Sequence, residues 1–252
     1  MAKKSAKSDR QAVIEQIRKK QRSADQRRGF MIVGVCAAIA LLIVGAAAFK
    51  PIKDWWDIRQ FKDKNLAAIG APAAVCGKVT EKKATGNQQH VPVGQKVDYK
   101  EAPPAFGAHW NQAGVAPAPM ERKLYEAGDR PELESLVHNL EHGYTILWYD
   151  TTIAGDKTAM DELRAIADKL AGTSNMRTKF IAAPWTSSDE GGAKFPNGEH
   201  VAFTHWSAGG SGETDAKKQQ GVWQYCSNVS GHALNDFMLD YPYTDSPEPG
   251  AM

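Results

Sequence analysis

The 252-residue chain has only three cysteines, and it lacks the short motifs that identify several large enzyme classes. It has no C-x-x-C-H haem attachment site, and no second pair of cysteines that would suggest a structural zinc site. It also has no glycine-rich nucleotide-binding loop, no G-x-S-x-G nucleophile motif and no protein-kinase signature. The candidate functional residues are therefore the seven histidines and their neighbouring carboxylates.

Charge is completely absent from one segment, Phe30–Phe49. Residues 1–29 carry ten Lys/Arg and three Asp/Glu, whereas residues 50–252 carry 21 Lys/Arg and 26 Asp/Glu. Twenty apolar residues in a helix span about 30 Å, the hydrocarbon thickness of a bilayer. A cleavable signal peptide is the alternative, but its apolar region is normally about 7–15 residues long. We therefore expect an uncleaved transmembrane helix that anchors the chain in the cell membrane.

The charge asymmetry also predicts the orientation of this anchor. Positively charged flanks stay in the cytoplasm, so the basic N-terminus is expected inside and the C-terminal part outside. Cys36 lies within the apolar span, which leaves Cys76 and Cys226 for the outer part. Two thiols outside a cell are usually paired, so the sequence predicts a Cys76–Cys226 disulfide that closes a loop of about 150 residues.

The composition predicts five segments along the chain. They are a cytoplasmic basic segment (1–29), the transmembrane helix (30–49), a stalk (50–75), an extracytoplasmic domain (76–242) and a tail (243–252). Within the basic segment, residues 8–28 are predicted to form a basic amphipathic helix. Within the domain, residues 76–130 are rich in glycine and proline, and the pattern becomes regular from residue 131 onward.

The regular part alternates between helical and extended patterns. Helices are predicted over residues 132–141, 158–171 and 230–241, and strands over residues 145–149, 178–184 and 200–206. Gly143 is expected to end the first helix. The order after Gly143 is β-α-β-β-α, which occurs among thioredoxin-like folds, and the predicted class of the outer domain is α+β.

Two histidines in V-H-N-L-E-H-G (137–143) are spaced to share one face of a helix. His109 follows the stiff Pro103-Pro104 pair, which could deliver it to the same place. Imidazoles suit copper or zinc, and a carboxylate favours zinc or another harder ion. The predicted metal ligands are His109, His138, His142, His90 and Glu141. The alternative is a set of core histidines that are hydrogen-bonded to backbone groups.

Two further arrangements fit the spacing less well. H-x-x-E-H is also the inverzincin peptidase motif, but Gly143 would end the required helix at once. Cys226, His232 and Met238 follow one another as in a cupredoxin ligand loop, but that arrangement would leave Cys76 unpaired.

The two histidine motifs, together with one N-terminal span, resemble a family. It is an actinobacterial family of single-pass membrane-anchored proteins that carry a domain of unknown function, with the signature P-P-x-x-G-x-H … V-H-x-L-E-H-G. The resemblance covers about residues 75–242, and its positions are filled here by His90, Tyr99, Pro103, Pro104, Gly107, His109, His138, Leu140, Glu141, His142 and Gly143. It implies an outer, membrane-anchored domain and names no reaction.

Three functions are compatible with these observations. The first is a non-catalytic domain that binds or handles a transition metal. The second is an accessory subunit of a larger membrane complex, for example a respiratory one, with structural histidines and other membrane-protein subunits as partners. The third is a metal-dependent hydrolase. Membrane lipid is an expected partner in each case, and nucleic acid is not, because the basic segment is cytoplasmic and lacks aromatic residues.

Overall fold

The computed structural model describes residues 2–86 and 88–251, apart from the side chains of residues 2–14, 17, 24, 25, 54 and 190. Much of the predicted basic segment therefore lies outside the described side chains. The chain divides into two compact units, Met1–Trp56 and Asp57–Met252, which are considered separately below.

The first unit is a single long helix, α1 (Ala2–Ile58). One stretch of it is long and apolar enough to cross a membrane. Its large apolar side chains are exposed, including Phe30 (78%), Leu41 (73%) and Leu42 (73%). A continuous apolar surface of this kind is unstable in water, and it is the property that a membrane anchor and a signal sequence share.

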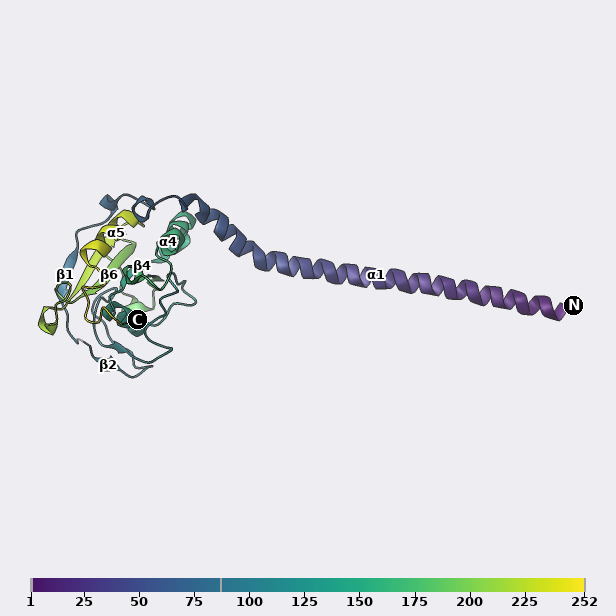
Figure 1. Cartoon of the computed structure of the whole chain (residues 1–252), viewed down its shortest axis with the longest axis horizontal. Coiled ribbons are helices and arrows are strands. Elements are labelled where there is room, and N and C mark those ends of the chain that lie inside the picture. Colours follow the sequence, from purple (N-terminus) through teal and green to yellow (C-terminus); the bar gives the residue numbers. More distant parts are fainter. Residues whose placement is uncertain (1, 87, 252) are drawn as a thin grey trace. The chain divides into compact units, whose positions relative to one another are not determined.

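The second unit is built on a five-stranded mixed sheet in the order β1-β7-β6-β4-β5 (Figure 1). The strands are β1 (Thr80–Lys83), β4 (Thr145–Tyr149), β5 (Phe180–Pro184), β6 (Val201–Ser207) and β7 (Gln220–Cys226). Strands β4 and β5 are parallel, and every other pair is antiparallel. The helices are α2 (Leu133–Glu141), α3 (Thr151–Gly155), α4 (Lys157–Lys169) and α5 (Gly231–Asp240). A separate parallel pair joins β2 (His90–Val91) to β3 (His109–Trp110).

Each face of the sheet packs against its own apolar core, because successive strand residues point to opposite faces. Leu147 and Phe203 lie in the core that α4 and α5 complete, together with Phe61 and Ile69. Trp148 and Trp206 lie in the opposite core, which α2 and the segment before it complete. The candidate histidines belong to this second side, where an irregular segment and one short helix meet the sheet.

The α+β class is confirmed, and the predicted helices and strands match observed ones to within a few residues. Two strands of the five-stranded sheet were not predicted: β1 is a fully exposed edge strand with three charged residues, and β7 contains a glycine and two glutamines. The short pair of β2 and β3 was not predicted either. Residues 57–75, which fall in the predicted stalk, pack into the unit through Phe61 and Ile69. The predicted tail also folds back, and Asp245 and Ser246 are buried.

The predicted disulfide between Cys76 and Cys226 is confirmed. It joins the segment that precedes β1 to the end of β7, and the two cysteines are also paired through an isolated backbone bridge. The linked residues are 150 positions apart, and Cys36 is the free cysteine of the described chain. A bridge of this kind is expected in an oxidising compartment.

Replacement of both bridging cysteines by alanine should lower the free energy of unfolding by about 2–5 kcal/mol, because the unfolded chain regains the freedom of a long loop. Thermal unfolding of the detergent-solubilised protein measures this change. Cys36→Ser is the matched control and should leave the melting temperature unchanged. Equal melting temperatures for the double variant and the control would show that the bridge contributes nothing to stability.

Candidate metal centre

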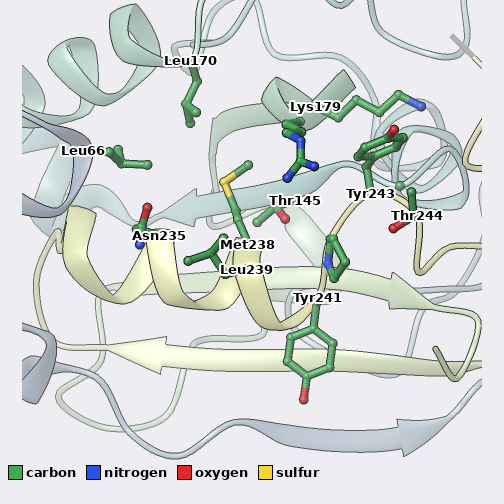
Figure 2. Close-up of a pocket in the computed structure, with 13 residues that line it drawn as sticks. Leu66, Thr145, Leu170, Lys179, Asn235, Met238, Leu239, Tyr241, Tyr243 and Thr244 are labelled. Carbon is green, nitrogen blue, oxygen red and sulfur yellow. The ribbon is translucent and has the colours of Figure 1, made fainter. Parts of the chain in front are cut away.

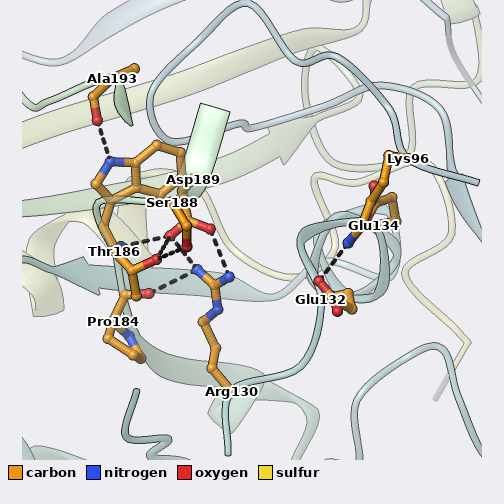
Figure 3. A network of polar contacts seen from close by, with 10 residues as sticks. Lys96, Arg130, Glu132, Glu134, Pro184, Thr186, Ser188, Asp189 and Ala193 are labelled. Atoms are coloured by element: carbon orange, nitrogen blue, oxygen red, sulfur yellow. Dashed lines mark hydrogen bonds and ion pairs between the residues drawn. The ribbon is translucent and has the colours of Figure 1, made fainter. Parts of the chain in front are cut away.

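Helix α2 and the residue that caps its C-terminus supply three of the five predicted ligands, and the N-terminal end of the helix is held on two sides (Figure 3). Just before the helix, Arg130 forms two hydrogen bonds of 2.7 Å to Asp189 and one of 3.0 Å to the carbonyl of Pro184. At its first turn, the buried Glu134 carboxylate accepts a hydrogen bond of 2.9 Å from the backbone N–H of Val97 and lies 3.6 Å from the Lys96 ammonium. Paired guanidinium–carboxylate contacts that are largely buried hold geometry well. The helix is therefore anchored to β5 and to the segment around Lys96.

Helix α2 ends at Glu141, just before Gly143, as the sequence predicts. Gly143 has a φ of +86°, which L side chains rarely adopt, and a Cβ there would lie 2.7 Å from the Ser246 hydroxyl. His142 is the last capping residue, and its N–H donates to the carbonyl of His138. Because the helix ends here, His138, Glu141 and His142 lie at its buried C-terminus, beside the C-terminal segment of the chain.

Strands β2 and β3 bring in the remaining two histidines, because their register pairs His90 with His109. The turn before β3 is held by the Tyr99 hydroxyl, which donates to the carbonyl of Ala108 at 2.7 Å. The indole of Trp223 donates to the carbonyl of Pro103 at 2.8 Å. The proline turn is therefore a fixed support that presents His109 to α2.

Four of the predicted residues form one compact group. A ligand atom from each of His90, His109, His138 and Glu141 lies within 4.8 Å of the others. Nε2 of His109 is 2.9 Å from Oε2 of Glu141, and Nε2 of His90 is 3.8 Å from the same oxygen. His109 and Glu141 are fully buried and His138 is 2% exposed, whereas the His90 side chain is 44% exposed. The group is thus buried on three sides and open at His90.

Backbone carbonyls determine which ring nitrogen carries the proton. Nδ1 of His109 lies 2.9 Å from the carbonyl of Gly107, and Nδ1 of His138 lies 2.7 Å from the carbonyl of Trp110. A carbonyl oxygen only accepts, so in each neutral ring Nδ1 donates and Nε2 keeps its lone pair. Metal-binding histidines commonly have this arrangement, in which the outer nitrogen is oriented by a backbone acceptor.

In the described part of the chain, the ring nitrogen of His109 and the carboxylate oxygens of Glu141 that face each other lack hydrogen-bond partners. Among the described residues, Nε2 of His109 and both carboxylate oxygens of Glu141 are buried and form no hydrogen bond. Nε2 of His109 and Oε2 of Glu141 are 2.9 Å apart, and this contact is a hydrogen bond only when Nε2 of His109 carries a proton. Buried acceptors that face one another are costly, and a cation between them would remove that cost.

The electrostatics favour deprotonated ligands. Burial lowers the pKa of His138 to about 4, and the nearby His109 acts in the same direction. Burial, together with the neighbouring His138, also lowers the pKa of His142 to about 4. Burial alone would raise the pKa of Glu141, but contact with His109 and the charges of the surrounding imidazoles outweigh it and lower that pKa. Neutral imidazoles and an ionised carboxylate are the forms that bind metal.

His142, the fifth predicted ligand, lies in an adjoining group that it forms with Glu141 and Glu248. Nε2 of His142 is 3.5 Å from Oε2 of Glu248. Glu248 was not among the predicted ligands, because residues 243–252 were expected to form a tail. Only the two flanking prolines, Pro247 and Pro249, signal that this acidic residue has a restricted backbone.

Lys179 fixes the C-terminal segment beside α2. Its buried ammonium donates to three carbonyls, those of His142 (2.6 Å), Pro249 (2.9 Å) and Ala251 (2.7 Å). Earlier in the same segment, the Asp245 carboxylate accepts hydrogen bonds from Ser207, Ala208 and Gly210, at and just after the end of β6. The segment is thus tied both to the end of α2 and to the sheet.

A pocket of about 410 Å³ lies on the other side of Gly143 and Thr145. Figure 2 shows its apolar residues Leu66, Leu170 and Met238 grouped together, while the Lys179 side chain extends away past Tyr243. No histidine, cysteine or carboxylate lines this pocket. The two groups of candidate ligands found among the described residues therefore lie outside this pocket.

Comparison with protein families identifies the domain. A family model described as "Protein of unknown function (DUF3105)" matches residues 90–252. The chain belongs to the DUF3105 family. Neither a curated protein nor a solved structure matches it. The DUF3105 region begins at His90 and therefore contains all five predicted ligands and Glu248.

Replacement of Lys179 by methionine should release the C-terminal segment, because three carbonyls lose their shared donor. We expect a loss of about 2–4 kcal/mol in unfolding free energy, together with faster removal of the last residues by carboxypeptidase. Lys194→Met, at an exposed position, is the control and should behave as the unchanged protein does. Equal carboxypeptidase rates in the two variants would contradict the role of Lys179.

Proposed function

We propose that the DUF3105 domain of this chain binds a transition-metal ion, zinc or copper, through His109, His138 and Glu141, with His90 at the exposed edge. One observation carries the proposal. The buried acceptors of His109 and Glu141 converge without hydrogen-bond partners in residues 2–86 and 88–251, while carbonyls hold the outer nitrogens of His109 and His138.

The spacing of the donor atoms supports this proposal. Zinc binds imidazole nitrogen at about 2.0–2.1 Å, which in a tetrahedron separates neighbouring donors by about 3.3 Å. The contacts from Glu141 Oε2 to the two histidines, 2.9 Å and 3.8 Å, lie on either side of that value. Three imidazoles and one carboxylate suit zinc or copper(II).

The exposure of His90 favours a handling role over a permanently closed site. Structural zinc sites are normally closed, with every ligand held by the fold. His90 is 44% exposed on a two-residue strand, so this ligand can leave and return without disturbing the core. In a purely structural histidine network, by contrast, the buried Glu141 carboxylate would depend on a protonated His109, whose Nε2 lies 2.9 Å away.

The proposal includes a location. The long apolar helix acts as an uncleaved anchor, with the basic N-terminus in the cytoplasm and the metal-binding domain outside the membrane. The net charge of +7 before the apolar span supports this orientation, and the Cys76–Cys226 disulfide supports an oxidising compartment for the domain.

Full-length protein purified in detergent should contain zinc or copper, measured by elemental analysis. His109→Ala and His138→Ala should each weaken metal binding by more than about 100-fold, since even groups that only orient a ligand contribute about 10–100-fold. His232→Ala, at an exposed histidine of α5, is the matched control and should retain the metal.

The competing structural role gives a different result. If the histidines only stabilise the fold, the purified protein contains no metal, and His109→Ala lowers the melting temperature without changing the metal content. That pattern would contradict the proposal.

Protease added to intact protoplasts tests the location. An epitope at the C-terminus should be digested, while one placed at residue 5 should be spared, because the membrane protects the cytoplasmic segment. The reverse pattern would refute the orientation. A soluble mature form that starts near Phe49 would show that the helix is a signal peptide.

A further inference from the structure

The Glu141 carboxylate belongs to two groups of ligand atoms at once. It joins His90, His109 and His138 on one side, and His142 and Glu248 on the other. In each of the two groups, the candidate ligand atoms all lie within 4.8 Å of one another. Neither oxygen of Glu141 forms a hydrogen bond among the described residues. A carboxylate with both oxygens buried and without hydrogen bonds is suited to bridging two cations.

The imidazole of His142 faces the second side through Nε2, whereas its unpartnered nitrogen is Nδ1. His142 is 5% exposed, and its Nδ1 is buried without a hydrogen-bond partner in the described chain. Its Nε2 lies 3.5 Å from Oε2 of Glu248, close to the separation of about 3.3 Å that two donors have around a tetrahedral zinc ion. The backbone N–H of Glu248 donates to the carbonyl of Glu141 at 2.9 Å, which fixes Glu248 beside the helix end.

We propose that this domain holds a pair of metal ions bridged by Glu141, the second ion being bound by Glu141, His142 and Glu248. This inference rests on the proposed function, because it adds a second position to the same centre. Two carboxylates and one imidazole are a harder set of ligands than three imidazoles and one carboxylate. They therefore favour zinc or manganese over copper(I) at the second position.

A shared carboxylate would bring the two ions to about the separation known from two-metal sites, roughly 3.5–4 Å. The arrangement also explains why the chain folds its last residues back onto α2. Lys179 donates to the carbonyls of both His142 and Pro249. His142 lies beside Glu248 in space, and Pro249 follows it in the sequence. The C-terminal segment thereby becomes part of the metal centre.

The test is the number of zinc ions bound by the full-length protein in detergent, determined by titration of the metal-free protein and by elemental analysis. Unchanged protein should bind two ions. Glu248→Gln and His142→Ala should each bind one, while Glu121→Gln, at an exposed position, should still bind two. Glu248 is 42% exposed, and glutamine keeps its shape and backbone contacts, so the variant is expected to fold.

The outcomes separate the two proposals. One ion in the unchanged protein, or two ions in Glu248→Gln, would overturn the second position and leave the first intact. No zinc or copper bound to the unchanged protein would overturn both. A drop from two ions to one in Glu248→Gln, with an unchanged melting temperature of the metal-free protein, is the result that we expect.

Discussion

The burial of the Glu141 carboxylate is the constraint on which the histidine side of this domain depends. The side chain is fully buried, its oxygens form no hydrogen bond among the described residues, and it faces the lone pair of His109 at 2.9 Å. An ionised carboxylate is costly to bury unless positive charge compensates it. Contact with His109 and the charges of the surrounding imidazoles outweigh burial and lower the pKa of Glu141, so that this carboxyl is ionised.

The elements around Glu141 are arranged to hold this group in place. Arg130 and Lys96 fix the start of α2, and the amide of Asn139 exchanges two hydrogen bonds with the backbone of Ala118. The parallel pair of β2 and β3 aligns His90 with His109. Lys179 closes the remaining side by holding the C-terminal segment. Rigid support of this kind is what a preorganised metal site requires.

The parts of this site that follow from local rules could be predicted from the sequence. The spacing of His138 and His142 fixes a common helix face, and the apolar run after Gly143 defines β4. The disulfide followed from the presence of two cysteines, Cys76 and Cys226, beyond the apolar span. Glu248 could not be predicted, because its position depends on Lys179 reaching three carbonyls far away in the sequence. Strand β1 was missed for a related reason: its charged residues form a strand only because β7 is there to pair with them.

The central claim is that the atoms around Glu141 coordinate a metal ion. The most direct measurement is anomalous X-ray scattering, at the absorption edge of the bound metal, from crystals of the purified full-length protein. The account predicts a peak about 2.0–2.2 Å from Nε2 of His109, from Nε2 of His138 and from an oxygen of Glu141. Crystals of metal-containing protein that show no peak at this position, with Glu141 hydrogen-bonded to ordered water instead, would contradict it.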